Sequence, residues 1–197
     1  MRIVKNKLPF PHVIIHDFYT EEELCDIWKE IDFLSCPNKL HSPEETASAL
    51  DKNGRVMKNN LGVHLDTVYF ERKTSSILSH NRKTFNHKLL NEIAEFDFSF
   101  NNMIVCNTDT TLLSYYENGG YYKPHRDMAT YTSLCWFYKE PKTLVGGDLY
   151  FPDYDYTLEI KNNMQIYFMS SVMHGVTKVK GHGRYTLTQF FFNTPLK

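Results

Sequence analysis

The chain has 197 residues, of which 42% are hydrophobic and 15% aromatic, and this predicts one globular domain with a sizeable core. Its 22 basic and 23 acidic side chains give a formal charge of -1, which excludes an overall positive field that would attract nucleic acid. No apolar run is long enough to cross a bilayer, and residues 1–7 lack the apolar stretch of a signal peptide, so we expect a cytoplasmic protein without a membrane partner.

The N-terminal segment predicts a short strand and then an amphipathic helix. Residues 12–18 are rich in β-formers, and Thr20 and Glu23 have the spacing of a capping box at a helix start. This helix has apolar residues at i, i+3, i+4 and i+7, which are Leu24, Ile27, Trp28 and Ile31.

From 36 to 60 the chain is polar and interrupted by proline and glycine, so we expect a long loop of the kind that often carries function.

A second strand and a second helix are predicted before residue 96. Residues 63–70 alternate as a strand does, and a helix is expected over 75–95, capped by Thr74 or Ser75. The helical part, about 20–96, is expected to buttress one outer face of the following sheets. Its buried residues are expected to be Ile77, Leu78, Phe85, Leu89 and Ile93.

From residue 103 onward the sequence becomes a succession of short strands separated by Gly, Pro, Asn and Asp turns. Many short strands predict a sandwich or double-sheet barrel, so the expected class is mainly β with N-terminal helices (α+β). No repeat or linker marks a second domain; we therefore predict one domain over 1–197, with its β core at about 103–193. The predicted strands are 103–106, 111–116, 132–138, 148–151, 156–160, 165–169, 175–179 and 184–193.

The four cysteines are scattered and form no C-x-x-C pair, so we expect reduced thiols rather than metal ligands. The first candidates for metal ligation are therefore two His-x-Asp pairs. On an extended backbone, the side chains of His125 and Asp127 leave the same face. His64 and Asp66 form a second copy on a predicted strand, where we interpret them as ordinary strand polarity, although they could still face the cleft. Two ligands are too few, because a redox iron site typically adds a second histidine and so completes a 2-His-1-carboxylate triad.

The second histidine is either His174 or His182. His174 follows the strand 165–169 and a turn, so it lies where a strand ends and the backbone changes direction. His182 lies between Gly181 and Gly183 in a predicted hairpin turn, and we expect it to be exposed. This favours His174.

A buried arginine is predicted ten residues beyond His174. Alternation places Arg184, Thr186, Thr188 and Phe190 on one face of a strand. A buried guanidinium needs an anion, which is either a protein carboxylate in a structural ion pair or a small dicarboxylate held bidentately.

Four segments together resemble the iron(II)- and 2-oxoglutarate-dependent oxygenases, specifically the prolyl 4-hydroxylase-like branch. They are residues 116–127, 146–152, 174–176 and 184–186, in that order; no such series follows the His64 copy. The resemblance implies a double-stranded β-helix (jelly-roll) core and Fe(II) ligated by three residues: His125, Asp127 and His174.

The resemblance also implies a cosubstrate site. Arg184 would pair with the C5 carboxylate of 2-oxoglutarate, helped by Thr186, and Tyr116 would hydrogen-bond the cosubstrate. Collagen-type prolyl hydroxylases often have lysine where this chain has Arg184, so collagen-like substrates are not implied. Gly146 and Gly147 would form a turn with a structural role. The aromatic side chains that we expect near the site are Tyr122, Trp136, Tyr138 and Phe190.

The implied activity is hydroxylation of an unactivated C–H bond with Fe(II), 2-oxoglutarate and O2, releasing succinate and CO2. The alternative is a non-catalytic cupin-like module, which the complete triad and Arg184 disfavour; nucleic-acid demethylation is disfavoured by the near-neutral charge. A prolyl residue of a protein or peptide is the family-level substrate, while a free amino acid, another peptide side chain or a small metabolite fits equally well. The 36–60 loop and the neighbouring strands would set specificity, and the sequence predicts no oligomeric state.

Overall fold

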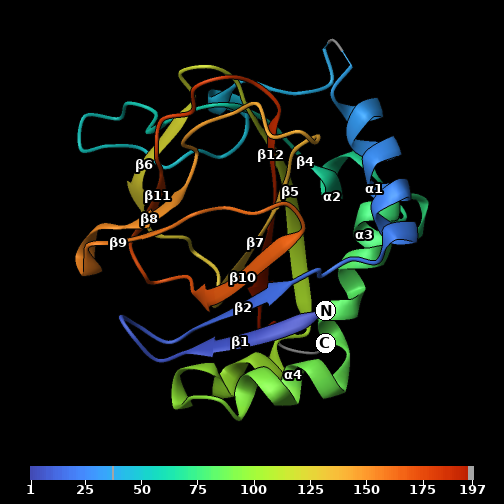
Figure 1. Ribbon diagram of the computed structural model, residues 1–197, viewed down its shortest axis with the longest axis vertical. Coiled ribbons are helices and arrows are strands. Elements are labelled where there is room, and N and C mark those ends of the chain that lie inside the picture. Colours follow the sequence, from blue (N-terminus) through green and yellow to red (C-terminus); the bar gives the residue numbers. More distant parts are fainter. Residues whose placement is uncertain (37, 195–197) are drawn as a thin grey trace.

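The computed structural model describes residues 1–36 and 38–194 and contains two antiparallel sheets (Figure 1). The larger sheet has the strand order β1 (Arg2–Asn6), β2 (His12–His16), β10 (Met164–Met169), β7 (Tyr131–Phe137), β12 (Arg184–Phe192), β5 (Thr108–Tyr116) and β4 (Leu61–His64). The smaller has the order β3 (Lys58–Asn59), β6 (Tyr121–His125), β11 (His174–Val176), β8 (Leu149–Phe151) and β9 (Tyr156–Leu158).

The helices lie beside the larger sheet, away from strands β6, β8, β9 and β11 (Figure 1). They are α1 (Glu21–Leu34), α2 (Leu65–Val68), α3 (Ser76–Asn81) and α4 (His87–Ala94), with 3-10 helices at Pro43–Glu45, Arg72–Thr74, Arg82–Phe85, Phe98–Val105 and Pro152–Tyr154. The prediction of a mainly β protein with N-terminal helices is confirmed. No helix in residues 1–36 or 38–194 is both long and apolar enough to span a membrane.

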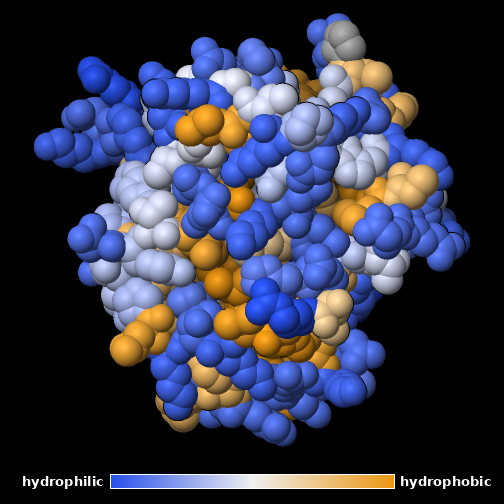
Figure 2. Space-filling view, viewed as in Figure 1, coloured by the Kyte–Doolittle hydropathy of each residue, from blue (hydrophilic) through white to orange (hydrophobic). Residues whose placement is uncertain are grey.

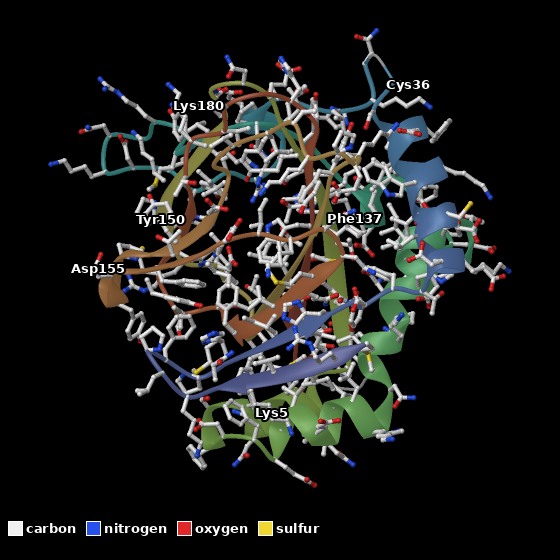
Figure 3. The ribbon with its side chains drawn as sticks, viewed as in Figure 1. Lys5, Cys36, Phe137, Tyr150, Asp155 and Lys180 are labelled. Carbon is white, nitrogen blue, oxygen red and sulfur yellow. The ribbon has the colours of Figure 1, made fainter. Side chains whose placement is uncertain are left out.

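Helix α1 begins at the predicted capping box. The Thr20 hydroxyl accepts from the Glu23 amide at 3.3 Å, and the Glu23 carboxylate accepts from the Thr20 amide at 2.8 Å. Its apolar stripe packs on the larger sheet, where the Trp28 ring lies 6.2 Å from that of Phe137, which is seen in the interior beside α1 (Figure 3). The fully buried Ile27 anchors this contact, and such a side chain contributes about 1.5–3 kcal/mol.

Alternate side chains of strand β12 point to opposite faces, one set toward the hydrophobic core and the other toward the candidate site. Its outward residues, including Leu187 and Phe191, join the core between the sheet and the helices. The opposite residues face a cavity between the two sheets, as predicted; they are Arg184, Thr186, Thr188 and Phe190. The molecular surface is mostly polar, with apolar groups exposed near the centre of the face in Figure 2.

The predicted strand over 63–70 is wrong. Strand β4 ends at His64, and α2 begins at Leu65, which is fully buried. The Asp66 carboxylate turns back to accept from the Thr111 amide at 2.6 Å and pairs with Arg72. This tertiary contact overrides the local β-propensity.

The predicted helix over 75–95 is broken into three pieces. Ser75 caps α3, as expected, by accepting from the Leu78 amide at 3.0 Å. After a 3-10 turn, Asn86 leaves the helical conformation and caps a new helix, α4, by accepting from the Lys88 amide at 3.0 Å. An internal side-chain cap of this kind competes with helix continuation.

The predicted strand at 103–106 is also wrong, because these residues belong to a 3-10 helix that starts after the cap Asp97. The Asp97 carboxylate accepts from the Ser99 amide at 3.0 Å. Strands β1 and β6 were not among the predicted runs, and the 36–60 loop contains a short 3-10 helix and strand β3. The remaining strands agree with the predicted runs apart from their ends. The four cysteines are free thiols, as expected.

Candidate active site

Strand register brings two histidines together from distant parts of the chain. His174, the first residue of β11, lies directly opposite His125, the last residue of β6. Residues in this relation have neighbouring side chains, and the two imidazole centroids are 4.5 Å apart. The pairing of β6 with β11 thus brings the two imidazoles together, although no local sequence motif contains both histidines.

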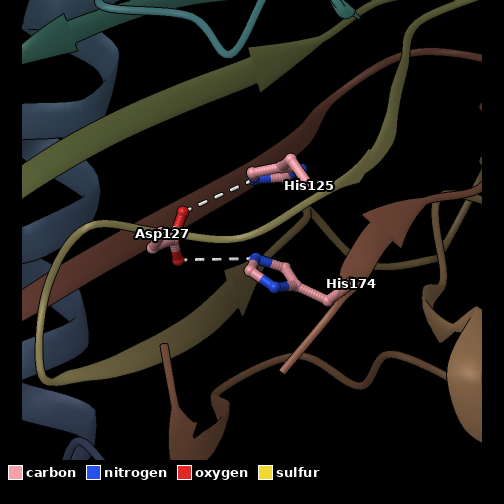
Figure 4. A group of neighbouring side chains, drawn as sticks. All are labelled: His125, Asp127 and His174. Atoms are coloured by element: carbon pink, nitrogen blue, oxygen red, sulfur yellow. Dashed lines mark ion pairs between the residues drawn. The ribbon is translucent and has the colours of Figure 1, made fainter. Parts of the chain in front are cut away.

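Asp127 completes the group from just beyond the strand. Its Oδ1 lies 3.5 Å from His125 Nε2, and its Oδ2 lies 3.5 Å from His174 Nε2 (Figure 4). The backbone amide of Asp127 donates to Ser170 O at 3.1 Å, so a turn rather than a continued strand aims the carboxylate.

The donor set fits one metal ion. One ligand atom from each of the three side chains lies within 4.8 Å of the others, and metal bonds to imidazole nitrogen and carboxylate oxygen are about 2.0–2.2 Å long. Two imidazoles and one carboxylate are the ligands of a facial triad for non-haem Fe(II), which leaves positions open for other molecules.

Backbone carbonyls fix which imidazole nitrogen faces the group. His125 Nδ1 lies 3.0 Å from Lys123 O, and His174 Nδ1 lies 2.9 Å from Val172 O. Because a carbonyl only accepts, each Nδ1 carries the hydrogen, and each Nε2 is left with a free lone pair. Outer partners of this kind orient metal-binding histidines.

The ligands are in a form that binds metal at neutral pH. Burial lowers the pKa of His174 to about 4, so its imidazole is neutral. For Asp127, burial raises the pKa, but its neighbours, the two histidine rings and the Thr132 hydroxyl, outweigh this effect, and the net pKa is lowered. Metal binding therefore displaces few protons from these two groups.

The three ligands line a cavity of about 510 Å³ that also contains Arg184. The guanidinium, only 1% exposed, donates from Nε to Gly147 O and from Nη1 to Thr186 Oγ1, both at 2.7 Å. It also lies over the Tyr116 ring, 4.3 Å from the centroid.

Arg184 has no protein counter-ion within the part of the chain that the structure describes, where no carboxylate oxygen lies within 4.0 Å of it. Burial lowers its pKa to about 10, so it remains charged at neutral pH. The ion-pair alternative is therefore not found among these residues. A buried guanidinium with unused donors in a cavity suits an anionic ligand, such as one end of a dicarboxylate.

The predicted glycine turn positions this arginine. Gly146 and Gly147 have φ values of +74° and +72°, which favour glycine. A Cβ on Gly147 would lie 2.6 Å from Cδ of Arg184. The absence of a side chain therefore allows the Gly147 carbonyl to reach the guanidinium.

Some expected wall residues are elsewhere. Tyr122 and Phe190 line the cavity, but Trp136 and Tyr138 pack in separate core clusters. As expected, His182 is exposed.

Sequence reasoning missed two polar residues around the site. Thr132 donates its hydroxyl to Asp127 Oδ2 at 2.6 Å, and Lys58 lines the cavity from within the predicted loop. His64 also lines it, so this residue of the second His-x-Asp copy does face the cleft. Only the His64 copy left a signal, since nothing local distinguishes Thr132 or Lys58.

These features define a class of protein: two facing antiparallel sheets that hold a His-Asp-His group and a buried arginine in one cavity. The family model for the 2OG-Fe(II) oxygenase superfamily matches residues 110–192. This segment of the chain is therefore similar to the 2OG-Fe(II) oxygenases, a superfamily whose members use Fe(II), 2-oxoglutarate and O2. A comparison with curated protein sequences found no match.

Solved structures share the fold. A Pseudomonas putida prolyl-4-hydroxylase superposes with a TM-score of 0.67 at 13% identity, covering 93% of each chain. A viral collagen prolyl hydroxylase from Paramecium Bursaria Chlorella virus-1 gives 0.55 at 14%, covering 91% of this chain and 94% of that one. A prolyl hydroxylase from Trichoplax adhaerens, solved with a hypoxia inducible factor peptide fragment, gives 0.60 at 15%, covering 92% and 83%. The double-stranded β-helix prediction is confirmed.

Proposed function

We propose that the chain hydroxylates an unactivated C–H bond, with Fe(II) held by His125, Asp127 and His174. The observation that supports this is the pair of 3.5 Å approaches between the two Nε2 atoms and the two Asp127 oxygens. In this geometry the three donors converge on one point, and their hydrogen-bonded far sides prevent rotation away from it.

Arg184 would bind the C5 carboxylate of 2-oxoglutarate, with Thr186 and Tyr116 beside it. Its Nη1 bond to Thr186 and its stacking on Tyr116 hold the guanidinium plane in one orientation. A planar fork that is already held loses little conformational entropy when it binds a carboxylate. This supports a dicarboxylate anchored at one end of the cavity.

The chemistry that Fe(II) supplies when bound, with O2 and 2-oxoglutarate, is oxygen insertion into a substrate C–H bond, with release of succinate and CO2. The protein's own contribution is positioning. Lys123 O and Val172 O hold the Nδ1 hydrogens, and Thr132 holds one carboxylate oxygen. The ligand side chains are only 4% to 11% exposed, which limits competing water.

The substrate we propose is a prolyl residue of a peptide or protein. Three structural neighbours are named as prolyl hydroxylases, and one was solved with a peptide fragment. Met128, next to Asp127, is 99% exposed and lines the same cavity. The site is thus open beside a ligand, so a residue of a longer chain can enter.

Two broader predictions from the sequence are part of this proposal. One catalytic domain spans residues 1–197, with the helices supporting the larger sheet. The protein is cytoplasmic, which agrees with four free thiols in a reducing compartment.

The test is conversion of 2-oxoglutarate to succinate by the full chain with Fe(II), with and without proline-containing peptides. We expect iron-dependent turnover, stimulated by a peptide, that falls at least about 100-fold in His125→Ala and Arg184→Ala. His182→Ala, which alters an exposed histidine, is the matched control. A folded wild-type protein without any iron-dependent turnover would instead support a non-catalytic cupin-like module.

A further inference from the structure

A second cation, Lys58, lies in the wall of the same cavity. Strand β3 places Lys58 opposite Tyr122 of β6, and the side chain lines the cavity together with His64. Lys58 is only 5% exposed, and its Nζ donates to Thr46 O at 3.1 Å. Lysine is rarely buried to this extent without a partner of opposite charge.

Within residues 1–36 and 38–194, no carboxylate oxygen lies within 4.0 Å of the Lys58 ammonium. Burial lowers the pKa of Lys58 to about 8, while the more distant Glu44 opposes this shift. The ammonium therefore predominates at pH 7. Among the residues that the structure describes, one of its three donors has a partner, Thr46 O, so the ammonium can donate to a ligand in the cavity.

Lys58 lies beside the reactive centre. Its Nζ is 5.6 Å from the centroid of the Tyr122 ring, and that ring stacks on His125 at a centroid distance of 3.6 Å. Lys58 and the proposed metal ligand His125 therefore lie beside the same aromatic ring.

The strand register separates this cation from Arg184. His64, whose pKa is lowered by burial and then by the nearby Lys58 charge, pairs with Leu112. Leu112 also pairs with Thr188, four residues from Arg184 along β12, which corresponds to roughly 13 Å. With ordinary carbon–carbon bond lengths, a five-carbon dicarboxylate spans only about 6–7 Å. The backbone positions of His64 and Arg184 are therefore farther apart than such a dicarboxylate is long.

We propose that Lys58, with His64 beside it, binds a carboxylate of the primary substrate, so that the enzyme selects substrates with an anionic group near the oxidised carbon. The carboxylate belongs either to a free amino acid or to an acidic residue of a peptide. This inference rests on the proposed function, since it assigns the substrate class of that same site. Charge-assisted hydrogen bonds to a desolvated ammonium supply the discrimination.

The test measures binding calorimetrically, without oxygen, to the full chain loaded with Fe(II) and 2-oxoglutarate. One arm compares N-acetylproline with its amide; the other compares a capped peptide that has aspartate beside proline with its asparagine analogue. Wild type is expected to bind the charged probe at least about tenfold more tightly in one arm, which identifies the source of the carboxylate.

Variants assign this preference to one side chain. Lys58→Met is expected to abolish it, and Lys58→Arg to retain it. Lys52→Met, a change at an exposed lysine of the same segment, is the matched control and is expected to retain it. If the methionine variant does not fold, Lys58→Gln removes the charge while keeping a donor.

Three results would overturn the proposal. In the first, wild type binds charged and neutral probes equally or binds no probe. In the second, the charge preference survives in Lys58→Met. In the third, the KM of Lys58→Met for 2-oxoglutarate rises by the same factor as its affinity for the probe falls. The last result would assign Lys58 to the cosubstrate. Failure of the proposed function is distinguishable, because it appears as absent turnover in air and not in these binding data.

Discussion

The two His-x-Asp pairs of this chain have the same spacing, and the histidine of each lines the same cavity. Among residues 1–36 and 38–194, however, only the His125 pair belongs to a three-ligand group that can hold a metal. His125 faces His174 across β6 and β11, whereas His64 faces Leu112 across β4 and β5. Asp127 has both oxygens directed at imidazoles.

In the other pair, the carboxylate already has structural partners. Asp66 accepts from the Thr111 amide and pairs with Arg72, and it lies in a helix rather than beside His64 on a strand. The comparison teaches that a His-x-Asp motif acquires its role from the residues that the sheet register and tertiary contacts place opposite it. Local spacing alone does not distinguish the two copies.

The largest expected effect is on metal affinity. Because His125 supplies one of three donors, His125→Ala should weaken Fe(II) binding at least about 100-fold, whereas His64→Ala should change it less than about twofold. Anaerobic titration with Fe(II), or with Co(II) as a spectroscopic substitute, measures both. If His64→Ala were the more damaging change, the wrong copy would have been assigned to the metal.

The two aspartates should show the reverse order in stability. Asp66→Ala leaves the Thr111 amide and Arg72 without their partner, so the free energy of unfolding should fall by about 2–4 kcal/mol. Asp127→Ala removes a partly desolvated charge from the metal-free protein and should change it by less than about 1 kcal/mol. Urea unfolding of both metal-free variants tests this, and equal losses would contradict a structural role that is special to Asp66.

Much of the site was predictable because it depends on order along the chain. The strands that hold His174 and Arg184 have clear β patterns, and the alternation of β12 correctly predicted which residues face the cavity. The turn at Gly146 and Gly147 was likewise predicted from the sequence, and both residues have the positive φ values that favour glycine.

What could not be predicted depends on contacts between distant segments. The break at Leu65 follows from the bonds of Asp66 to Arg72 and Thr111, and no pattern over 63–70 reveals them. Lys58 appeared to be one more polar residue in a loop, because its burial results from pairing with Tyr122 on β6. Burial and register are properties of the fold rather than of the segment.

A smaller effect is expected in the pH dependence of stability. The pKa of His174 is lowered from 6.5 to about 4 in the folded protein, so between these values the unfolded chain binds more protons. The stability of the metal-free protein should therefore rise with pH from about 4 to 6.5 and then level off, by on the order of 2 kcal/mol for this group.

Replacing this histidine should flatten the rise. Urea unfolding at pH 5 and 7 should show a smaller difference in His174→Leu than in wild type, and a weaker reduction in His64→Leu, because His174 is buried whereas His64 is partly exposed. If the two variants had the same slope, the electrostatic distinction between His174 and His64 would not hold.

The smallest effect concerns the orientation of Asp127. Thr132 is fully buried and donates to Asp127 Oδ2 at 2.6 Å, so Thr132→Val keeps the shape but releases one oxygen. Fe(II) affinity should fall about tenfold, as is usual for a lost outer hydrogen bond. The matched change beside the other copy is Thr67→Val, which removes a bond to His64 O and should leave the affinity within about twofold. Should Thr132→Val also be silent, the backbone bond from Asp127 to Ser170 would suffice to aim the carboxylate, and the difference between the two aspartates would depend on backbone position alone.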